Sequence, residues 1–234
     1  MKKLIPGLIL VSLLFGACEP DADIAPRLNE AGITILVDAS KDGGGWWFPQ
    51  TPPVLSASAP HQGKAMADFL RHLGYQVDEL RVGDTITLAK LNNYRCVIRA
   101  SGFYNYSASE VQAYQLYLNG GGSLLLTNDH MQYTSNDLLS ATLGVDFEGT
   151  IYGNVDQYAT HAITQSATPF YYNAGSFVRN PDPARLTVLG WVNTNAVMGI
   201  VRHPAARIFF IGDINGIEGM PQPFMGNLFN WLLN

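Results

Sequence analysis

Four side chains able to exchange protons or bind cations follow apolar runs that the sequence predicts as buried strands. They are Asp38, Asp129, His130 and Asp213. In a parallel α/β sheet the carboxyl ends of the strands share one edge, where ligand crevices form. Three carboxylates and an imidazole at such a rim could bind a divalent cation or act as general acid and base. The alternative is that Asp38 and Asp213 cap neighbouring loops and helices through their carboxylates.

The loop after the first predicted strand is a second candidate, because glycines at 43–45 precede the aromatic pair Trp46 and Trp47. No Lys-Ser/Thr step follows these glycines, so they do not form a phosphate loop. Aromatic faces offer large amphipathic contact areas to sugars and apolar partners. We expect Trp46 and Trp47 at the strand-end rim, contacting a ligand together with Ser101 and Asn128. The alternative is a loop that folds back over the sheet edge. We expect no cofactor, and no metal ion is assigned.

The N-terminus has the pattern of an export signal. Two lysines precede an uncharged apolar run over 4–15, which is too short to span a bilayer as a helix. The run ends in Phe15-Gly16-Ala17-Cys18, which resembles a lipobox with Phe in place of the usual Leu. We therefore expect cleavage before Cys18, lipidation of that cysteine, and a lipid-anchored protein on the extracytoplasmic side of the cell envelope. The alternative is an ordinary secretory signal followed by an incidental cysteine.

Composition limits what the rest of the chain can do. A signal peptide over 1–17 and a polar tether over 18–31 leave one domain over 32–234. Apolar content of 47% and charged content of 14% suit a globular core. The net charge is −5 and no Lys/Arg cluster occurs, so nucleic acid is not an expected partner. Cys96 lies within an apolar run, and we interpret it as a buried strand residue rather than a reactive thiol.

Strand and helix patterns alternate along the chain. Ser107 and Glu110 form a capping box at the start of one predicted helix. Alternating strands and helices predict an α/β domain with a flavodoxin-like, doubly wound, mainly parallel sheet and helices on both faces. The region 145–200 is expected to be mostly strand and loop. Strands are predicted over 33–38, 76–80, 94–100, 123–127, 186–192, 196–201 and 207–212, and helices over 61–73, 107–119, 136–143 and from Pro223 onward.

Three segments together resemble class I glutamine amidotransferase-like domains. The first is the helix, Gly-Gly and apolar strand over 107–126. The second is His161-Ala162-Ile163-Thr164, similar to a His-Pro-Ile-Thr step. The third is the strand over 207–213 with the closing helix that ends at 230–233. The resemblance implies an amidotransferase-like α/β fold over most of 33–234. It is nearest to envelope members associated with transporters and gliding machinery.

The chemistry of that superfamily does not follow from the resemblance. Its amidotransferases place a nucleophilic cysteine on a sharp turn after the Leu-rich strand, whereas this chain has Thr127-Asn128-Asp129-His130 there. Two functions stay open. One is a non-catalytic binding or scaffolding domain with a glycan or protein partner in the envelope. The other is an envelope hydrolase that acts on glycan or peptide material through Asp129 and His130 with Asp38 or Asp213.

Overall fold

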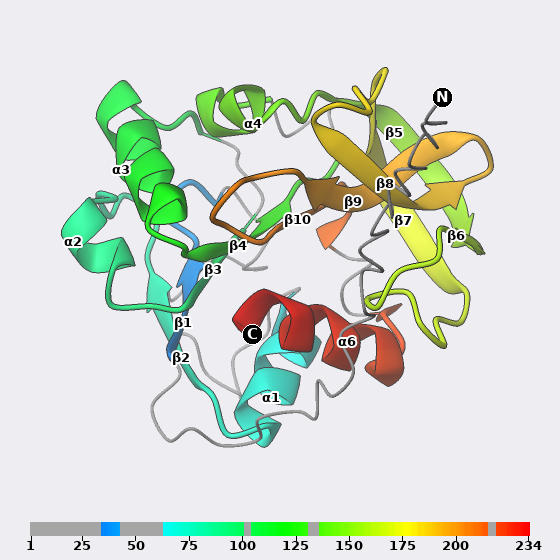
Figure 1. Cartoon of the computed structure of the whole chain (residues 1–234), viewed down its shortest axis with the longest axis horizontal. Coiled ribbons are helices and arrows are strands. Elements are labelled where there is room, and N and C mark those ends of the chain that lie inside the picture. Colours follow the sequence, from blue (N-terminus) through cyan, green and yellow to red (C-terminus); the bar gives the residue numbers. More distant parts are fainter. Residues whose placement is uncertain (1–33, 43–62, 101–103, 131–135, 215–218) are drawn as a thin grey trace, which may run out of the picture.

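A central sheet of eight strands, in the order β2-β1-β3-β4-β10-β9-β8-β6, organises the domain (Figure 1). The computed structural model describes residues 34–42, 63–100, 104–130, 136–214 and 219–234. The first five strands in that order pair in parallel, and the last three pair antiparallel. This confirms the predicted doubly wound, mainly parallel sheet. The strands are β1 (Thr34–Asp38), β2 (Gln76–Leu80), β3 (Cys96–Arg99), β4 (Ser123–Thr127), β10 (Ile208–Ile211), β9 (Asn195–Val201), β8 (Leu186–Val192) and β6 (Gln157–Tyr158).

Helices cover both faces of this sheet. The helices α1 (Lys64–His72) and α6 (Gln222–Leu233) lie on one face. The helices α2 (Leu88–Leu91), α3 (Ala108–Asn119) and α4 (Leu138–Leu143) lie on the other (Figure 1). Side chains alternate along each strand, so Ile35 packs under α1 and α6 while Leu36 packs under α3. The two faces of the sheet therefore have separate cores, and we call them the α6 face and the α3 face.

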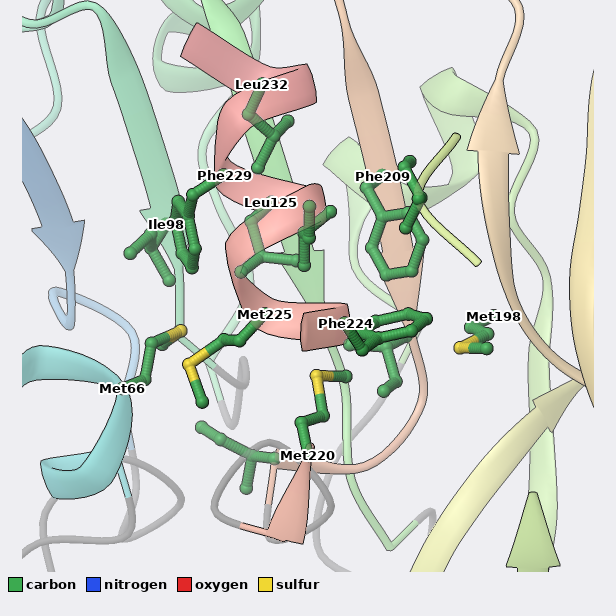
Figure 2. Packing of buried hydrophobic residues seen from close by; sticks show 14 of the residues in the cluster. Met66, Ile98, Leu125, Met198, Phe209, Met220, Phe224, Met225, Phe229 and Leu232 are labelled. Atoms are coloured by element: carbon green, nitrogen blue, oxygen red, sulfur yellow. The ribbon is translucent and has the colours of Figure 1, made fainter. Parts of the chain in front are cut away.

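The core of the α6 face is largely aromatic. Phe224 and Phe229 of α6 pack over Ile98, Leu125 and Phe209 of the central strands (Figure 2). The rings of Phe209 and Phe224 meet with centroids 6.3 Å apart. Burying one such side chain stabilises the fold by roughly 1.5–3 kcal/mol. This packing fixes the closing helix against the sheet.

The predicted capping box at the start of α3 is confirmed. The Ser107 hydroxyl accepts a hydrogen bond from the Glu110 amide at 3.3 Å, and the Ser107 amide donates to Glu110 Oε2 at 2.9 Å. After the helix, Gly122 makes room for Tyr117, because a Cβ on Gly122 would lie 2.2 Å from the ring of Tyr117. The turn from α3 into β4 therefore depends on a glycine at this position.

A separate two-stranded ribbon lies beside the main sheet. Its strands, β5 (Phe147–Val155) and β7 (Phe170–Val178), pair antiparallel and pack along β8 and β9. The Ser176 amide joins the ribbon to the strand-end rim by donating to the Gly212 carbonyl at 2.7 Å. The sequence predicted strand and loop for this region but did not locate these two strands.

A buried ion pair connects β3 with the start of α4. Arg99 and Asp137 are both buried, and the Arg99 guanidinium bonds the Asp137 carboxylate and the Thr127 carbonyl. Asp137 is also the N-cap of α4 and accepts the Ser140 amide at 2.7 Å, which explains why the helix begins at Leu138 rather than at 136. Desolvation would lower the pKa of Arg99, but the adjacent Asp137 carboxylate outweighs it and raises that pKa.

We predict that Asp137→Ala destabilises the domain by about 3–5 kcal/mol, because it leaves the Arg99 charge buried without its carboxylate. Urea unfolding followed by circular dichroism measures the change. The matched control is Asp68→Ala, which removes a partly exposed carboxylate paired with Lys64 on α1 and should cost less than about 1 kcal/mol. Equal losses in the two variants would show that the Arg99–Asp137 pair is not a stabilising element.

Candidate functional site

Three carboxylates gather at the carboxyl ends of the strands, on the α6 face. Asp42 and Asp213 are fully buried, and Asp129 is 8% exposed. Asp213 Oδ2 accepts the Asn173 amide of β7 at 2.6 Å, and Asp129 Oδ1 accepts the His130 amide at 2.8 Å. Burial raises the pKa of Asp129 to about 7, helped by the charges of Asp213 and Asp42 and opposed by the His130 amide. Asp129 is therefore a carboxyl group that can exchange a proton near neutral pH.

Polar side chains from the ribbon surround these carboxylates. His130 Nδ1 lies 3.1 Å from the Thr150 hydroxyl of β5. The Asn128 amide donates to the Ser176 hydroxyl of β7 at 3.4 Å. The structure thus brings together Asn128, Asp129, His130 and Asp213, which follow β4 and β10. We call these four residues with Asp42 the strand-end rim.

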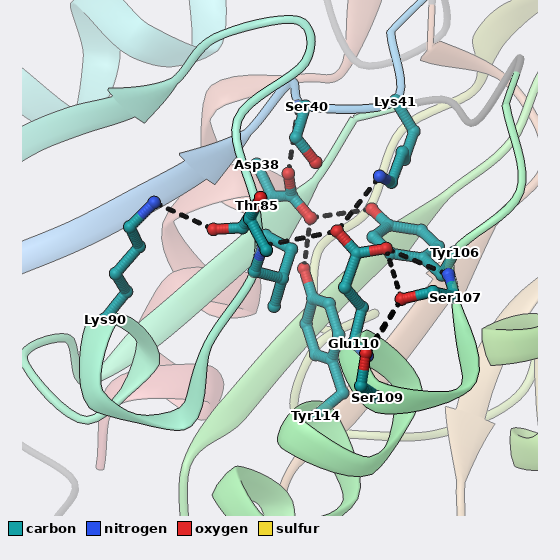
Figure 3. Close-up of polar contacts among 11 residues, drawn as sticks. Asp38, Ser40, Lys41, Thr85, Lys90, Tyr106, Ser107, Ser109, Glu110 and Tyr114 are labelled. Carbon is teal, nitrogen blue, oxygen red and sulfur yellow. Dashed lines mark hydrogen bonds and ion pairs between the residues drawn. The ribbon is translucent and has the colours of Figure 1, made fainter.

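Asp38 lies apart from the rim, on the α3 face. Its carboxylate accepts the hydroxyls of Tyr106 at 2.6 Å and Tyr114 at 2.5 Å, and the Ser40 amide at 3.0 Å (Figure 3). Burial, and then the charge of Asp38, raises the pKa values of both tyrosines well above the usual range. Both hydroxyls therefore stay protonated and donate to Asp38. This arrangement is the capping alternative for Asp38, since the carboxylate holds its own loop and α3.

A second buried ion pair lies next to Asp38. Lys41 Nζ bonds Glu110 Oε1 at 3.0 Å and lies 5.5 Å from the centre of the Tyr106 ring (Figure 3). Burial alone would raise the pKa of Glu110, but hydrogen bonds from the Ser107 amide, Lys41 and the Ile86 amide lower it. Glu110 therefore joins the loop after β1 to the start of α3. The sequence singled out Glu110 only as a capping residue and missed Lys41 and Arg99.

Several predicted site residues lie outside the described residues, namely Cys18, Trp46, Trp47 and Ser101. Within the described part of the chain, no group of three or more His, Cys, Asp or Glu side chains is arranged to hold a metal ion. The same part contains no helix long and apolar enough to cross a membrane.

The amidotransferase nucleophile is absent from the described residues. Asn128 and Asp129 follow β4, and Cys96 lies inside β3 instead. Cys96 is fully buried, as predicted, and desolvation raises the pKa of its thiol to about 12. The nucleophilic form, the thiolate, is thus disfavoured. His161 holds a local turn, because its Nδ1 accepts the Ile163 amide at 3.1 Å.

Solved structures with the same fold exist, although no protein-family model and no curated sequence matches the chain. The N-terminal domain of mmIFT52 is similar at a TM-score of 0.64 and 15% identity, over 85% of this chain and 96% of that one. A ThuA-like protein from Bacteroides uniformis is similar at 0.54 and 14%, over 91% and 93%. A GMP synthase-type protein from Thermoplasma acidophilum is similar at 0.53 and 13%, over 87% and 97%. The chain therefore has a glutamine amidotransferase-like α/β fold.

The raised pKa of Asp129 gives the domain a predictable pH dependence. In the unfolded chain this carboxyl loses its proton near pH 4, whereas in the folded protein it keeps the proton up to about pH 7. Folding is therefore favoured below pH 4 and loses this contribution as the pH rises through 7. We predict that wild type loses on the order of 2 kcal/mol relative to Asp129→Asn between pH 5 and pH 8, measured by urea unfolding. Asp156→Asn, at an exposed position, should follow wild type; a pH-independent gap for Asp129→Asn would contradict the raised pKa.

Proposed function

We propose that this protein is a lipid-anchored component of the cell envelope whose amidotransferase-like domain binds or scaffolds a partner without turnover. The anchor is supported by Phe15-Gly16-Ala17-Cys18 directly after a short uncharged apolar run. The partner is an envelope glycan or protein, on the extracytoplasmic side of the membrane. The anchor would keep the domain close to both kinds of partner.

One observation carries the non-catalytic part of the proposal. The position after β4, where amidotransferases of this fold hold their nucleophile, is occupied by Asn128 and Asp129, and Cys96 lies buried inside the neighbouring strand. In addition, Asp38 is held by Tyr106 and Tyr114 within the fold. These side chains support a stable polar framework rather than a nucleophile with its base.

A hydrolase is the second candidate, and the environment of Asp129 favours it. A carboxyl group with a pKa of about 7 next to a second carboxylate, Asp213, is suited to general acid or base work. His130 follows Asp129 directly and contacts Thr150 of the ribbon. Such an enzyme would act on glycan or peptide material of the envelope.

The anchor is tested by cell fractionation. We predict that wild type sediments with membranes and that Cys18→Ser moves the protein to the soluble fraction, because the acylated thiol is lost. Cys96→Ala is the matched control: a free buried cysteine behaves as a small apolar side chain, so this variant should stay in the membrane fraction. A Cys18→Ser protein that matures and sediments as wild type does would refute lipidation at Cys18.

Turnover is tested on isolated peptidoglycan and on denatured protein. The binding proposal predicts that wild type releases no reducing ends and no free amines above a blank. The hydrolase alternative instead predicts release that changes with pH around 7 and falls at least about 100-fold in Asp129→Asn, the scale of general acid–base catalysis. Release with that dependence would replace the binding proposal by the hydrolase.

A further inference from the structure

The outer face of the β5–β7 ribbon carries four exposed side chains in one patch. Tyr152 pairs with Asn173, and Asn154 pairs with Tyr171, in a regular antiparallel ladder. Directly paired residues of such a ladder point to the same side, and so do residues two apart on one strand. Tyr152, Asn154, Tyr171 and Asn173 therefore share one face of the ribbon, and all four are exposed.

The inner face of the same ladder is packed against the domain. Tyr172 and Val155 are fully buried, and Phe170 is nearly so. Gly153 lies so close to β8 that a Cβ at this position would come within 2.8 Å of Val192. The ribbon therefore cannot turn over to bury its tyrosines, and the outer patch is a fixed feature of the surface.

The two tyrosines form an open aromatic pair. Each is 57% exposed. They occupy diagonal positions of the ladder, which are about 7–8 Å apart at the backbone and within reach of aromatic side chains. Large apolar groups left open to water in one patch usually mark a binding surface. The flanking Asn154 and Asn173 add amide donors and acceptors without adding charge.

We propose that this outer patch, formed by Tyr152, Asn154, Tyr171 and Asn173, is a binding platform for a neutral polysaccharide chain. The negative face of a tyrosine ring attracts the C–H groups on the apolar face of a sugar ring. The asparagine amides are placed to bond the hydroxyls at its edge. The platform depends neither on the lipid anchor nor on the chemistry of the strand-end rim.

Size and charge favour this ligand over others. A stable protein interface buries about 800 Å² on each partner, which four side chains on a two-stranded ribbon do not offer. The patch has no cationic group, and the chain carries a net charge of −5, which disfavours anionic polymers. A neutral sugar chain needs only one aromatic face for each ring that it stacks.

The platform also lies next to the strand-end rim. The backbone amide of Asn173 donates to Asp213 at 2.6 Å, while the Asn173 side chain belongs to the outer patch. A chain lying on the two tyrosines would therefore pass beside the rim. The patch extends the proposed binding function to residues that no motif in the sequence indicates.

Affinity electrophoresis of the purified full chain tests the platform, in native gels that contain laminarin, galactomannan or xylan as neutral probes and alginate as an anionic one. We expect at least one neutral polysaccharide to retard wild type. The double variant Tyr152→Ala/Tyr171→Ala should weaken that retardation at least about tenfold, as loss of central aromatic anchors does. Tyr152→Phe/Tyr171→Phe should keep most of it, because the ring faces remain.

Tyr104→Ala is the matched control, since Tyr104 is 59% exposed but lies outside the ribbon, and it should bind as wild type does. The thermal melts of all variants should agree, because the substituted side chains are exposed. The proposal is overturned if no neutral polysaccharide retards wild type, if only alginate does, or if the double alanine variant binds as wild type does. None of these outcomes bears on the anchor, which fractionation tests separately.

Discussion

The strand ends of this domain depend on the burial of one cation. Arg99 is fully buried at the end of β3, where an unpaired charge would cost several kcal/mol. Its guanidinium bonds the Asp137 carboxylate and the Thr127 carbonyl, and it lies 6.0 Å from the centre of the Tyr106 ring. These partners come from the N-cap of α4, the end of β4 and the start of α3. Because the charge needs its partners at once, these elements are fixed relative to one another.

The rim follows from this arrangement. Thr127, which holds Arg99 through its carbonyl, also donates its hydroxyl to the Arg99 carbonyl at 2.8 Å, and Asn128 and Asp129 come next in the chain. Asp129 is therefore positioned by an ion pair on the opposite face of the sheet. The α3 face uses its charged groups to hold elements together, while the α6 face carries the carboxyl group whose pKa lies near neutrality. The two faces of one strand edge thus have different roles.

The sequence predicted most of the sheet because its strands are short apolar runs and its main helix carries the Ser107 capping box. It did not anticipate Arg99, because an arginine after Cys96-Val97-Ile98 looks like the exposed end of a strand; only the continuation of the apolar run to Ala100 indicates burial. It grouped Asp38 with Asp129 and Asp213 because all three follow strands. Alternation within the first strand separates them, since Asp38 has the parity of Leu36, which packs on the α3 face. The partners of Asp38, two tyrosines at 106 and 114, are far away in the chain and could not be assigned from spacing.

The ribbon explains why binding is expected at the periphery of this fold. It packs so closely on the rim that a Cβ on Gly175 would lie 2.4 Å from Asp213 Cβ, and one on Gly212 would lie 2.2 Å from the Ser176 carbonyl. Asp213 is consequently buried and bonded to the ribbon backbone. A ligand cannot reach that carboxylate without displacing β7, whereas the outer tyrosines are open to solvent. In this domain the contact that closes part of the strand-end rim also presents Tyr152 and Tyr171 outward, so recognition is favoured at the surface of the ribbon rather than beneath it.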